Sequence, residues 1–190
     1  MKKVLVIVDP QNDFITGTLA VKGAKEKMLK LSDYLVKEGN SYDSILVTID
    51  NHPENNSSFK ENGGIWPKHC VEFSNGWKIP TYLSSVLLLT TKATVECYLK
   101  GTEADHEEYS ILDNDDDGHD FRVYLEELDI QDGIEIHICG IAGDYCVLET
   151  LKGLNKLFDN ITVLSDYTAS IDGGVALNEY ISKHPNIKLV

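Results

Sequence analysis

The sequence has few of the features that mark membrane-bound, secreted or nucleic-acid-binding proteins. Its N-terminal apolar run, from Val4 to Val8, stops at Asp9 and is too short for a signal peptide or a transmembrane helix. Cysteine is also scarce, with 4 in 190 residues, which is too few for the disulfide framework of a secreted scaffold. We therefore expect a cytoplasmic protein whose thiols are reduced.

Positive charge is scarce as well. The chain has 17 Lys and Arg residues against 31 Asp and Glu residues, which gives a formal net charge of −14. Nucleic acids and anionic membranes bind basic surfaces, so neither is an expected partner. The length of 190 residues and the 42% hydrophobic content are sufficient for one buried core. We expect residues 1–190 to form a single domain.

The pattern of apolar residues alternates between strand and helix. Short β-branched segments predict buried parallel strands at 3–9, 44–50, 94–100, 134–140, 161–166 and 187–190. Amphipathic patterns predict helices at 25–38, 121–128, 144–158 and 174–183. This alternation predicts an α/β fold with a mostly parallel sheet and right-handed crossovers. Two long segments, 51–80 and the strongly acidic 101–120, are expected to be loops, and long loops in compact domains are often functional.

Reactive side chains lie where the predicted strands end. Asp9, Asp50 and Lys100 each occupy the last position of a strand, and Cys146 follows the turn after another strand. Ligands of parallel α/β sheets bind outside the carboxyl ends of the strands. Any one of these residues alone is explained equally well as a helix cap or turn residue. The four together predict an active site.

Cys146 is the candidate nucleophile. It lies in the first turn of a predicted helix, where free N–H groups and the helix dipole favour a thiolate. Asp9 can accept the thiol proton, and Lys100 can stabilise the charge of both groups. The N–H groups of the preceding turn would form an oxyanion hole. The alternative is a small buried apolar residue, which is how we interpret Cys97 and Cys139 within their strands.

A second group of residues suits a metal ion. Asp50 and His52 stand two positions apart at a strand end, and Glu61 and His69 follow in the long loop. Such a set of ligands fits one divalent ion, with Zn²⁺ favoured over Fe²⁺ or Mn²⁺. An isolated Asp-x-His pair would usually be a surface coincidence. The neighbouring Trp66, an aromatic wall beside His69, makes a binding site the preferred interpretation.

Five stretches of the sequence match one known family. They are DPQNDF (9–14), TIDNHP (48–53), WPKHC (66–70), LKG (99–101) and GIAGDYCVLET (140–150). In these stretches the chain resembles the nicotinamidases of the isochorismatase-like cysteine hydrolase superfamily. The order Asp, Lys, Cys is typical of the superfamily, whereas Asp-x-His with WPxHC is typical of its metal-dependent nicotinamidase branch.

The resemblance implies a three-layer αβα fold with a six-stranded, mostly parallel sheet in the order 3-2-1-4-5-6. It also implies a cis peptide bond between Ile141 and Ala142, and an oxyanion hole formed by the amides of Ala142 and Cys146. Asp50, His52 and His69 would hold the metal, with Glu61 as a fourth ligand. A homo-oligomer is compatible with the resemblance.

The activity implied by the resemblance is hydrolysis of nicotinamide, a small-molecule amide, in NAD salvage. The ring nitrogen would bind the metal, and three aromatic side chains would enclose the ring: Phe14, Trp66 and Tyr109. Asp9 would take the proton of Cys146, and the thiolate would form a thioester with release of ammonia. Water would then release nicotinate, while Lys100 stabilises charge throughout.

Two segments depart from the family pattern. Asn56 stands near the position where many relatives have a histidine in the metal loop. Glu107 and Glu108 precede Tyr109 where relatives often have Asp-Ser, and an acidic insert follows. These departures leave open the fourth metal ligand and the function of Tyr109.

Three alternative functions remain from the sequence. A cysteine amidohydrolase of the same superfamily that acts on a carbamoyl or ureido amide would need no metal. Isochorismatase chemistry, the cleavage of a vinyl ether, would not need Cys146. A metal- or ligand-binding protein without enzymatic activity would have no use for the combination of Asp9, Lys100 and Cys146.

Overall fold

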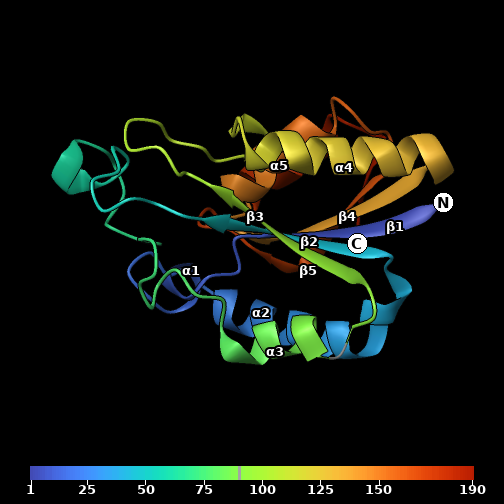
Figure 1. Cartoon of the computed structure of the whole chain (residues 1–190), viewed down its shortest axis with the longest axis horizontal. Helices are drawn as coiled ribbons and strands as arrows, with labels where there is room; N and C mark the ends of the chain where they lie inside the picture. The colour runs from blue at the N-terminus through green and yellow to red at the C-terminus, as the bar shows by residue number, and fades with distance from the viewer. Residues whose placement is uncertain (90) are drawn as a thin grey trace.

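The computed structural model describes residues 1–89 and 91–190 and is built on one sheet with helices on both faces (Figure 1). Its six strands are all parallel and follow the order β3-β2-β1-β4-β5-β6. The strands are β1 (Lys2–Val8), β2 (Ser44–Asp50), β3 (Thr94–Lys100), β4 (Ile134–Ile141), β5 (Ile161–Ala169) and β6 (Ile187–Leu189). The predicted fold class, strand order and strand positions are confirmed.

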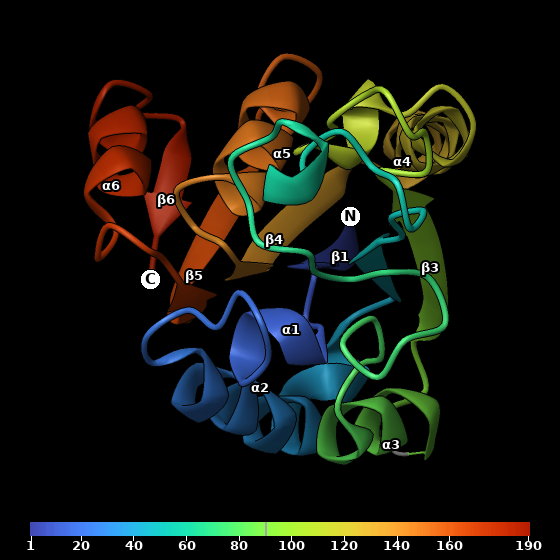
Figure 2. The ribbon, with the colours of Figure 1, turned by 90° about the vertical axis from the view of Figure 1, so that its left-hand side faces the viewer.

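The helices form the two outer layers. They are α1 (Asn12–Ile15), α2 (Ala24–Glu38), α3 (Thr81–Leu89), α4 (Asp117–Asp132), α5 (Cys146–Leu154) and α6 (Val175–Ser182). Figure 2, which looks along the strands, shows α4, α5 and α6 on one face and α1, α2 and α3 on the other. No helix in the described residues is both long and apolar enough to cross a membrane.

The helices differ from the sequence prediction in several places: the short α1 was not predicted, and α5 begins at Cys146 and ends at Leu154 rather than spanning 144–158. The helix α3 was not predicted, because its sequence TYLSSVLLL is apolar on several sides and shows little helical periodicity; Leu83, Val86 and Leu87 face the core. The helix α4 begins at Asp117, inside the acidic segment that was expected to be a loop. The sequence pattern became helical only at Phe121, where the buried stripe begins.

The sheet separates two hydrophobic cores because neighbouring side chains of a strand point to opposite faces. In β1, Val6 packs with residues of α4, α5 and α6. Its neighbours Leu5 and Ile7 pack with Met28 and other residues of α2, and with α3. All of these side chains are fully buried, so the strand ends are held on a rigid base.

The register of the sheet places the predicted reactive residues together. Val8, the last residue of β1, pairs with Thr48 of β2 and with Gly140 of β4, and Asp50 of β2 pairs with Lys100 of β3. All strands are parallel, so these ends lie at one edge of the sheet, where the long loops gather at the left of Figure 1.

Candidate active site

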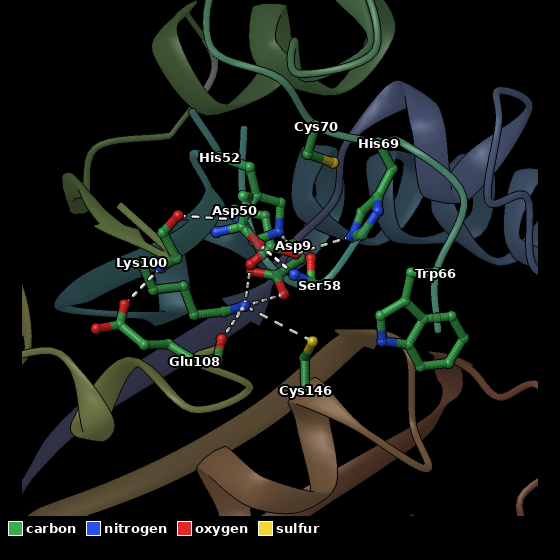
Figure 3. Close-up of polar contacts among 12 residues, drawn as sticks. Asp9, Asp50, His52, Ser58, Trp66, His69, Cys70, Lys100, Glu108 and Cys146 are labelled. Atoms are coloured by element: carbon green, nitrogen blue, oxygen red, sulfur yellow. Dashed lines mark hydrogen bonds and ion pairs between the residues drawn. The ribbon is translucent and has the colours of Figure 1, made fainter. Parts of the chain in front are cut away.

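Four reactive side chains meet at the carboxyl edge of the sheet. Asp9 follows β1, Asp50 ends β2, Lys100 ends β3, and Cys146 begins α5 after the turn that leaves β4. Each is at most 6% exposed, and Figure 3 shows them pointing toward one another. The structure therefore brings together the four residues that the strand ends predicted.

Lys100 is the centre of this cluster. Its Nζ lies 2.9 Å from Oδ2 of Asp9 and 3.6 Å from Sγ of Cys146, and it also donates to Oδ1 of Asp50. Burial alone lowers the pKa of Lys100, but the two carboxylates outweigh it and hold that pKa well above its usual value. The ammonium thus stays charged inside the protein.

Asp9 is held by contacts on both carboxylate oxygens. The hydroxyl of Thr48 donates to Oδ1 over 2.6 Å, and Lys100 binds Oδ2. The backbone of Asp9 lies in the left-handed region, with φ of 47°, as it turns out of β1. Burial raises the pKa of the Asp9 carboxyl, and Lys100 opposes this only in part. A carboxylate with a raised pKa is a better general base near neutral pH.

Cys146 is arranged as a thiol that can be activated. Burial raises the pKa of its thiol well above the usual value, with Lys100 acting in the opposite direction. The resting group is therefore protonated. An oxygen of Asp9, an oxygen of Asp50 and Sγ of Cys146 all lie within 4.8 Å of one another, so a base is within reach of the thiol.

Ala142 and Cys146, whose backbone N–H groups are the expected oxyanion-hole donors, line the same pocket. Within the described residues, neither the N–H of Ala142 nor that of Cys146 donates to a backbone or side-chain acceptor. The peptide bond between Ile141 and Ala142 is cis, as the family resemblance implies. The free donors are consistent with an oxyanion hole, in which one donor is typically worth about 3 kcal/mol.

Asp50, His52 and His69 form the second half of the site. One ligand-type atom from each lies within 4.8 Å of the others, and all three side chains are buried. Nδ1 of His52 contacts the carbonyl of Gly101 at 2.9 Å, and Nδ1 of His69 contacts that of Pro67 at 2.8 Å. Because a carbonyl only accepts, each Nδ1 must carry the proton, which leaves both Nε2 atoms as lone-pair ligands.

This group fits a divalent cation. Nε2 of His52 is buried and makes no hydrogen bond in the described part of the chain, although it lies 3.5 Å from Oδ2 of Asp50. Burial alone would raise the pKa of Asp50, but Lys100 and His52 lower it below its usual range. Burial lowers the pKa of His69, which favours its neutral, ligating form. A carboxylate with two imidazoles is a donor set that Zn²⁺ and similar ions accept.

The structure does not bring Glu61 to this group. The carboxylate of Glu61 lies 3.0 Å from Nζ of Lys68, and its side chain is 56% exposed. Lys68 also binds Glu54, so Glu61 belongs to a surface ion-pair group. This corrects the expectation that Glu61 is a fourth ligand. Ser58, in the same loop, is buried, and its hydroxyl has no hydrogen-bond partner in the described residues.

A pocket opens over both halves of the site. The three aromatic residues expected from the resemblance, Phe14, Trp66 and Tyr109, line it together with Asp50, His69 and Cys146. Nε1 of Trp66 donates to the hydroxyl of Tyr109 over 3.0 Å, which fixes one aromatic wall to the other. Tyr109 therefore lies in the pocket despite the unusual residues before it.

Several supporting residues were missed or misplaced by sequence reasoning. The Gln11 amide bonds both the N–H and the carbonyl of Asp50 at 2.8 Å, and Asp13 accepts from the backbone N–H of Cys70 at 2.8 Å. Both lie in DPQNDF, so the motif was a usable signal. Asp144, in the turn before α5, accepts from the backbone N–H groups of residues 171 and 172.

Comparison with known proteins agrees with this geometry. The isochorismatase domain, as a sequence family, matches residues 3–174. The chain belongs to the isochorismatase family. Within it, the nicotinamidase/pyrazinamidase of Mycobacterium tuberculosis is 30% identical over 89% of this chain and 87% of its own length. The family resemblance seen in the motifs is confirmed.

Solved structures of the family match over almost the whole chain. The pyrazinamidase of Pyrococcus horikoshii, in complex with zinc, is 32% identical with a TM-score of 0.76, covering 100% of this chain and 99% of its own. The yeast nicotinamidase bound to the inhibitor nicotinaldehyde is 29% identical with a TM-score of 0.82, covering 99% of both chains.

Proposed function

We propose that this protein is a metal-dependent nicotinamidase that converts nicotinamide to nicotinate and ammonia, as a step of NAD salvage. The observation that carries the proposal is the position of Cys146: it lies beside Asp9 and Lys100 in a pocket that also holds Asp50 and His69. The similarity to a nicotinamidase/pyrazinamidase and to a zinc-containing pyrazinamidase supports both the amide substrate and the metal.

The chain's own residues account for the covalent chemistry. Asp9 takes the proton of the Cys146 thiol, and the thiolate attacks the carboxamide carbon. The amides of Ala142 and Cys146 stabilise the oxyanion, and Asp9 returns the proton to the departing ammonia. The resulting thioester is hydrolysed by water that Asp9 deprotonates. Lys100 keeps the charges of Asp9 and Cys146 balanced during both steps.

The remaining residues bind and orient the substrate. Phe14, Trp66 and Tyr109 enclose a flat aromatic ring, and the buried walls exclude bulk water from the thioester. Asp50, His52 and His69 would hold the divalent ion. When bound, the ion supplies a Lewis-acid anchor for the ring nitrogen of the substrate.

The rival within the family is a metal-independent hydrolase of a carbamoyl or ureido amide. Such an enzyme has no need for the buried Nε2 of His52, which has no hydrogen-bond partner in the described residues, or for the neutral ring of His69. These two features favour the metal-dependent activity.

The decisive experiment measures ammonia release from nicotinamide by the zinc-loaded protein, by the metal-free protein and by Cys146→Ala. We expect turnover only by the loaded wild type. Absence of turnover there would exclude the nicotinamidase assignment, and full activity of Cys146→Ala would exclude the nucleophile. Activity that survives complete metal removal would favour the rival hydrolase.

A further inference from the structure

The acidic segment after β3 is partly folded into the protein rather than extended into solvent. Glu108 is only 3% exposed. Its Oε2 accepts hydrogen bonds from the backbone N–H of Gly101 at 2.5 Å and from Nδ2 of Asn114 at 3.0 Å. Asn114 is itself buried and accepts from the N–H of Asp116, where α4 begins. A buried carboxylate in a loop expected to be solvated requires an explanation.

The explanation begins with the position of β3 at the edge of the sheet. β3 pairs only with β2, and Lys100 bonds toward β2 through its carbonyl, which accepts from Asn51 at 2.8 Å. The N–H groups of Leu99 and Gly101 therefore point away from the sheet. Asp117 accepts from Leu99 at 2.6 Å, and Glu108 accepts from Gly101. Two carboxylates of the acidic segment thus hold the backbone on both sides of Lys100.

Gly101 contacts both Glu108 and His52, a residue of the metal-binding half of the site. Its carbonyl accepts from Nδ1 of His52 at 2.9 Å, the bond that leaves Nε2 of His52 free. Gly101 has a φ of +66°, and a Cβ at this position would overlap the His52 ring. The glycine thus lies in close contact with the imidazole, and any shift of its backbone moves the ring.

Glu108 also touches the nucleophilic half. Its backbone carbonyl accepts from Nζ of Lys100 at 3.2 Å, the same ammonium that contacts Cys146 and Asp9. Figure 3 shows the Glu108 side chain and its own carbonyl bonded to two different points of the 100–101 segment. One residue therefore contacts the backbone that orients His52 and the side chain that activates Cys146.

We propose that Glu108 is a positioning residue that couples the two halves of the site. Its carboxylate fixes Gly101, and through Gly101 it fixes the tautomer and the direction of His52. The same contact places its carbonyl against Lys100. Partners of metal-ligating histidines commonly affect metal affinity or activity by about 10- to 100-fold. The effect of Glu108 on catalysis rests on the proposed nicotinamidase function, but its effect on metal binding does not.

Two substitutions of Glu108 distinguish the effect of the position of its acceptor oxygen from the effect of its charge. Glu108→Gln keeps an acceptor oxygen at the same place and removes the charge, whereas Glu108→Asp keeps the charge and withdraws the acceptor by about 1.5 Å, the length of one C–C bond. Asp115→Ala is the matched control, since Asp115 is an exposed carboxylate of the same segment with no part in the site. Zinc affinity of the metal-free proteins is measured by competition with a chromophoric chelator, and kcat/KM is measured for nicotinamide.

We expect Glu108→Asp to lose about 10- to 100-fold in zinc affinity and a similar factor in kcat/KM. Glu108→Gln should stay within about threefold of the wild type, because the Gly101 hydrogen bond survives. Asp115→Ala should not change. Unaltered zinc affinity in Glu108→Asp, or a loss in Glu108→Gln as large as that in Glu108→Asp, would overturn the proposal.

Further measurements test the proposal if Glu108→Asp does not fold, or if the wild type lacks activity or zinc binding. If Glu108→Asp does not fold by circular dichroism, Asn114→Ala removes the second donor on the same oxygen; we then expect about a three- to tenfold loss of zinc affinity, and no loss would overturn the proposal.

If the wild type binds zinc without hydrolysing nicotinamide, the proposed function fails while the zinc results still test the coupling. If it binds no zinc, the rate of Cys146 alkylation, followed by peptide mass spectrometry, replaces affinity; it should fall in Glu108→Asp and not in Glu108→Gln, and equal rates would overturn the proposal.

Discussion

The hydroxyl of Thr48 donates a hydrogen bond of 2.6 Å to Oδ1 of Asp9, inside a site where both side chains are fully buried. The carboxylate that we propose as general base is therefore oriented by the neighbouring strand β2, while Lys100 holds its other oxygen. Thr48 lies two positions before Asp50 on that strand, so one strand supports both the base and the metal-binding residues.

Replacing Thr48 by valine should impair catalysis without unfolding the protein. Valine has the same shape but leaves Oδ1 of Asp9 without a partner, so the carboxylate loses one of the two contacts that orient it. We expect kcat/KM for nicotinamide to fall about tenfold, which corresponds to a hydrogen bond of about 1.4 kcal/mol to a charged group. Thr48→Ser, which keeps the hydroxyl, is the control; equal activity of the two variants would contradict this assignment.

Metal binding should stabilise the folded protein. The proposed ligands Asp50, His52 and His69 are assembled only in the native state, so an ion at one hundred times its Kd should add about 2.7 kcal/mol to the free energy of unfolding. The melting temperature measured with zinc should exceed that measured with a chelator. His52→Ala should lose this difference, whereas Glu61→Ala should keep it. A loss in Glu61→Ala would restore Glu61 as a ligand.

Tyr109 should contribute to substrate binding through its ring. Tyr109→Phe removes the acceptor of the Trp66 N–H but keeps the aromatic wall, and we expect KM for nicotinamide to change by less than about threefold. Tyr109→Ala removes the wall and should raise KM about tenfold, the cost of about 1.4 kcal/mol of lost ring contact. Steady-state kinetics of the two variants distinguish the ring from the hydroxyl, and a KM in Tyr109→Ala equal to that of the wild type would exclude this residue from the pocket wall.

The stability of the fold should depend on pH through His137 of β4. Its ring lies 2.7 Å from the hydroxyl of Tyr42 and 2.9 Å from Glu135, with Lys3 and Lys188 nearby, and burial lowers the pKa of this imidazole below 6.5. The unfolded state then binds more protons than the folded state, so the free energy of unfolding falls as the pH drops below about 6.5.

This pH dependence is tested by urea unfolding at pH 7.5 and at pH 5.5. His137→Gln removes the titrating ring, and we expect the loss of stability between these two pH values to be smaller than in the wild type. The substitution also removes a hydrogen bond, which lowers stability at both pH values. The quantity compared between the two proteins is therefore the change in the free energy of unfolding between these pH values. An unchanged difference would show that His137 does not titrate in this range.

Local patterns in the sequence were sufficient to predict the sheet and the residues at its carboxyl edge. The strands were recognisable as short, mostly apolar runs, and the polar residues that end the first three identified Asp9, Asp50 and Lys100. The turn before Cys146 and the Asp-x-His pair added the nucleophile and the metal-binding group. Such patterns are local, and parallel pairing then brings the strand ends to one edge.

The acidic residues that belong to the site could not be predicted from local patterns, because they are selected by contacts in the folded chain. Glu61 and Glu108 are both carboxylates in polar loops, and nothing in the neighbouring sequence distinguishes them. Folding places Glu61 against Lys68 at the surface and buries Glu108 against the N–H of Gly101. The difference arises from contacts between distant segments, because a free N–H on the edge strand needs an acceptor, whereas a solvated ion pair can form with any nearby lysine.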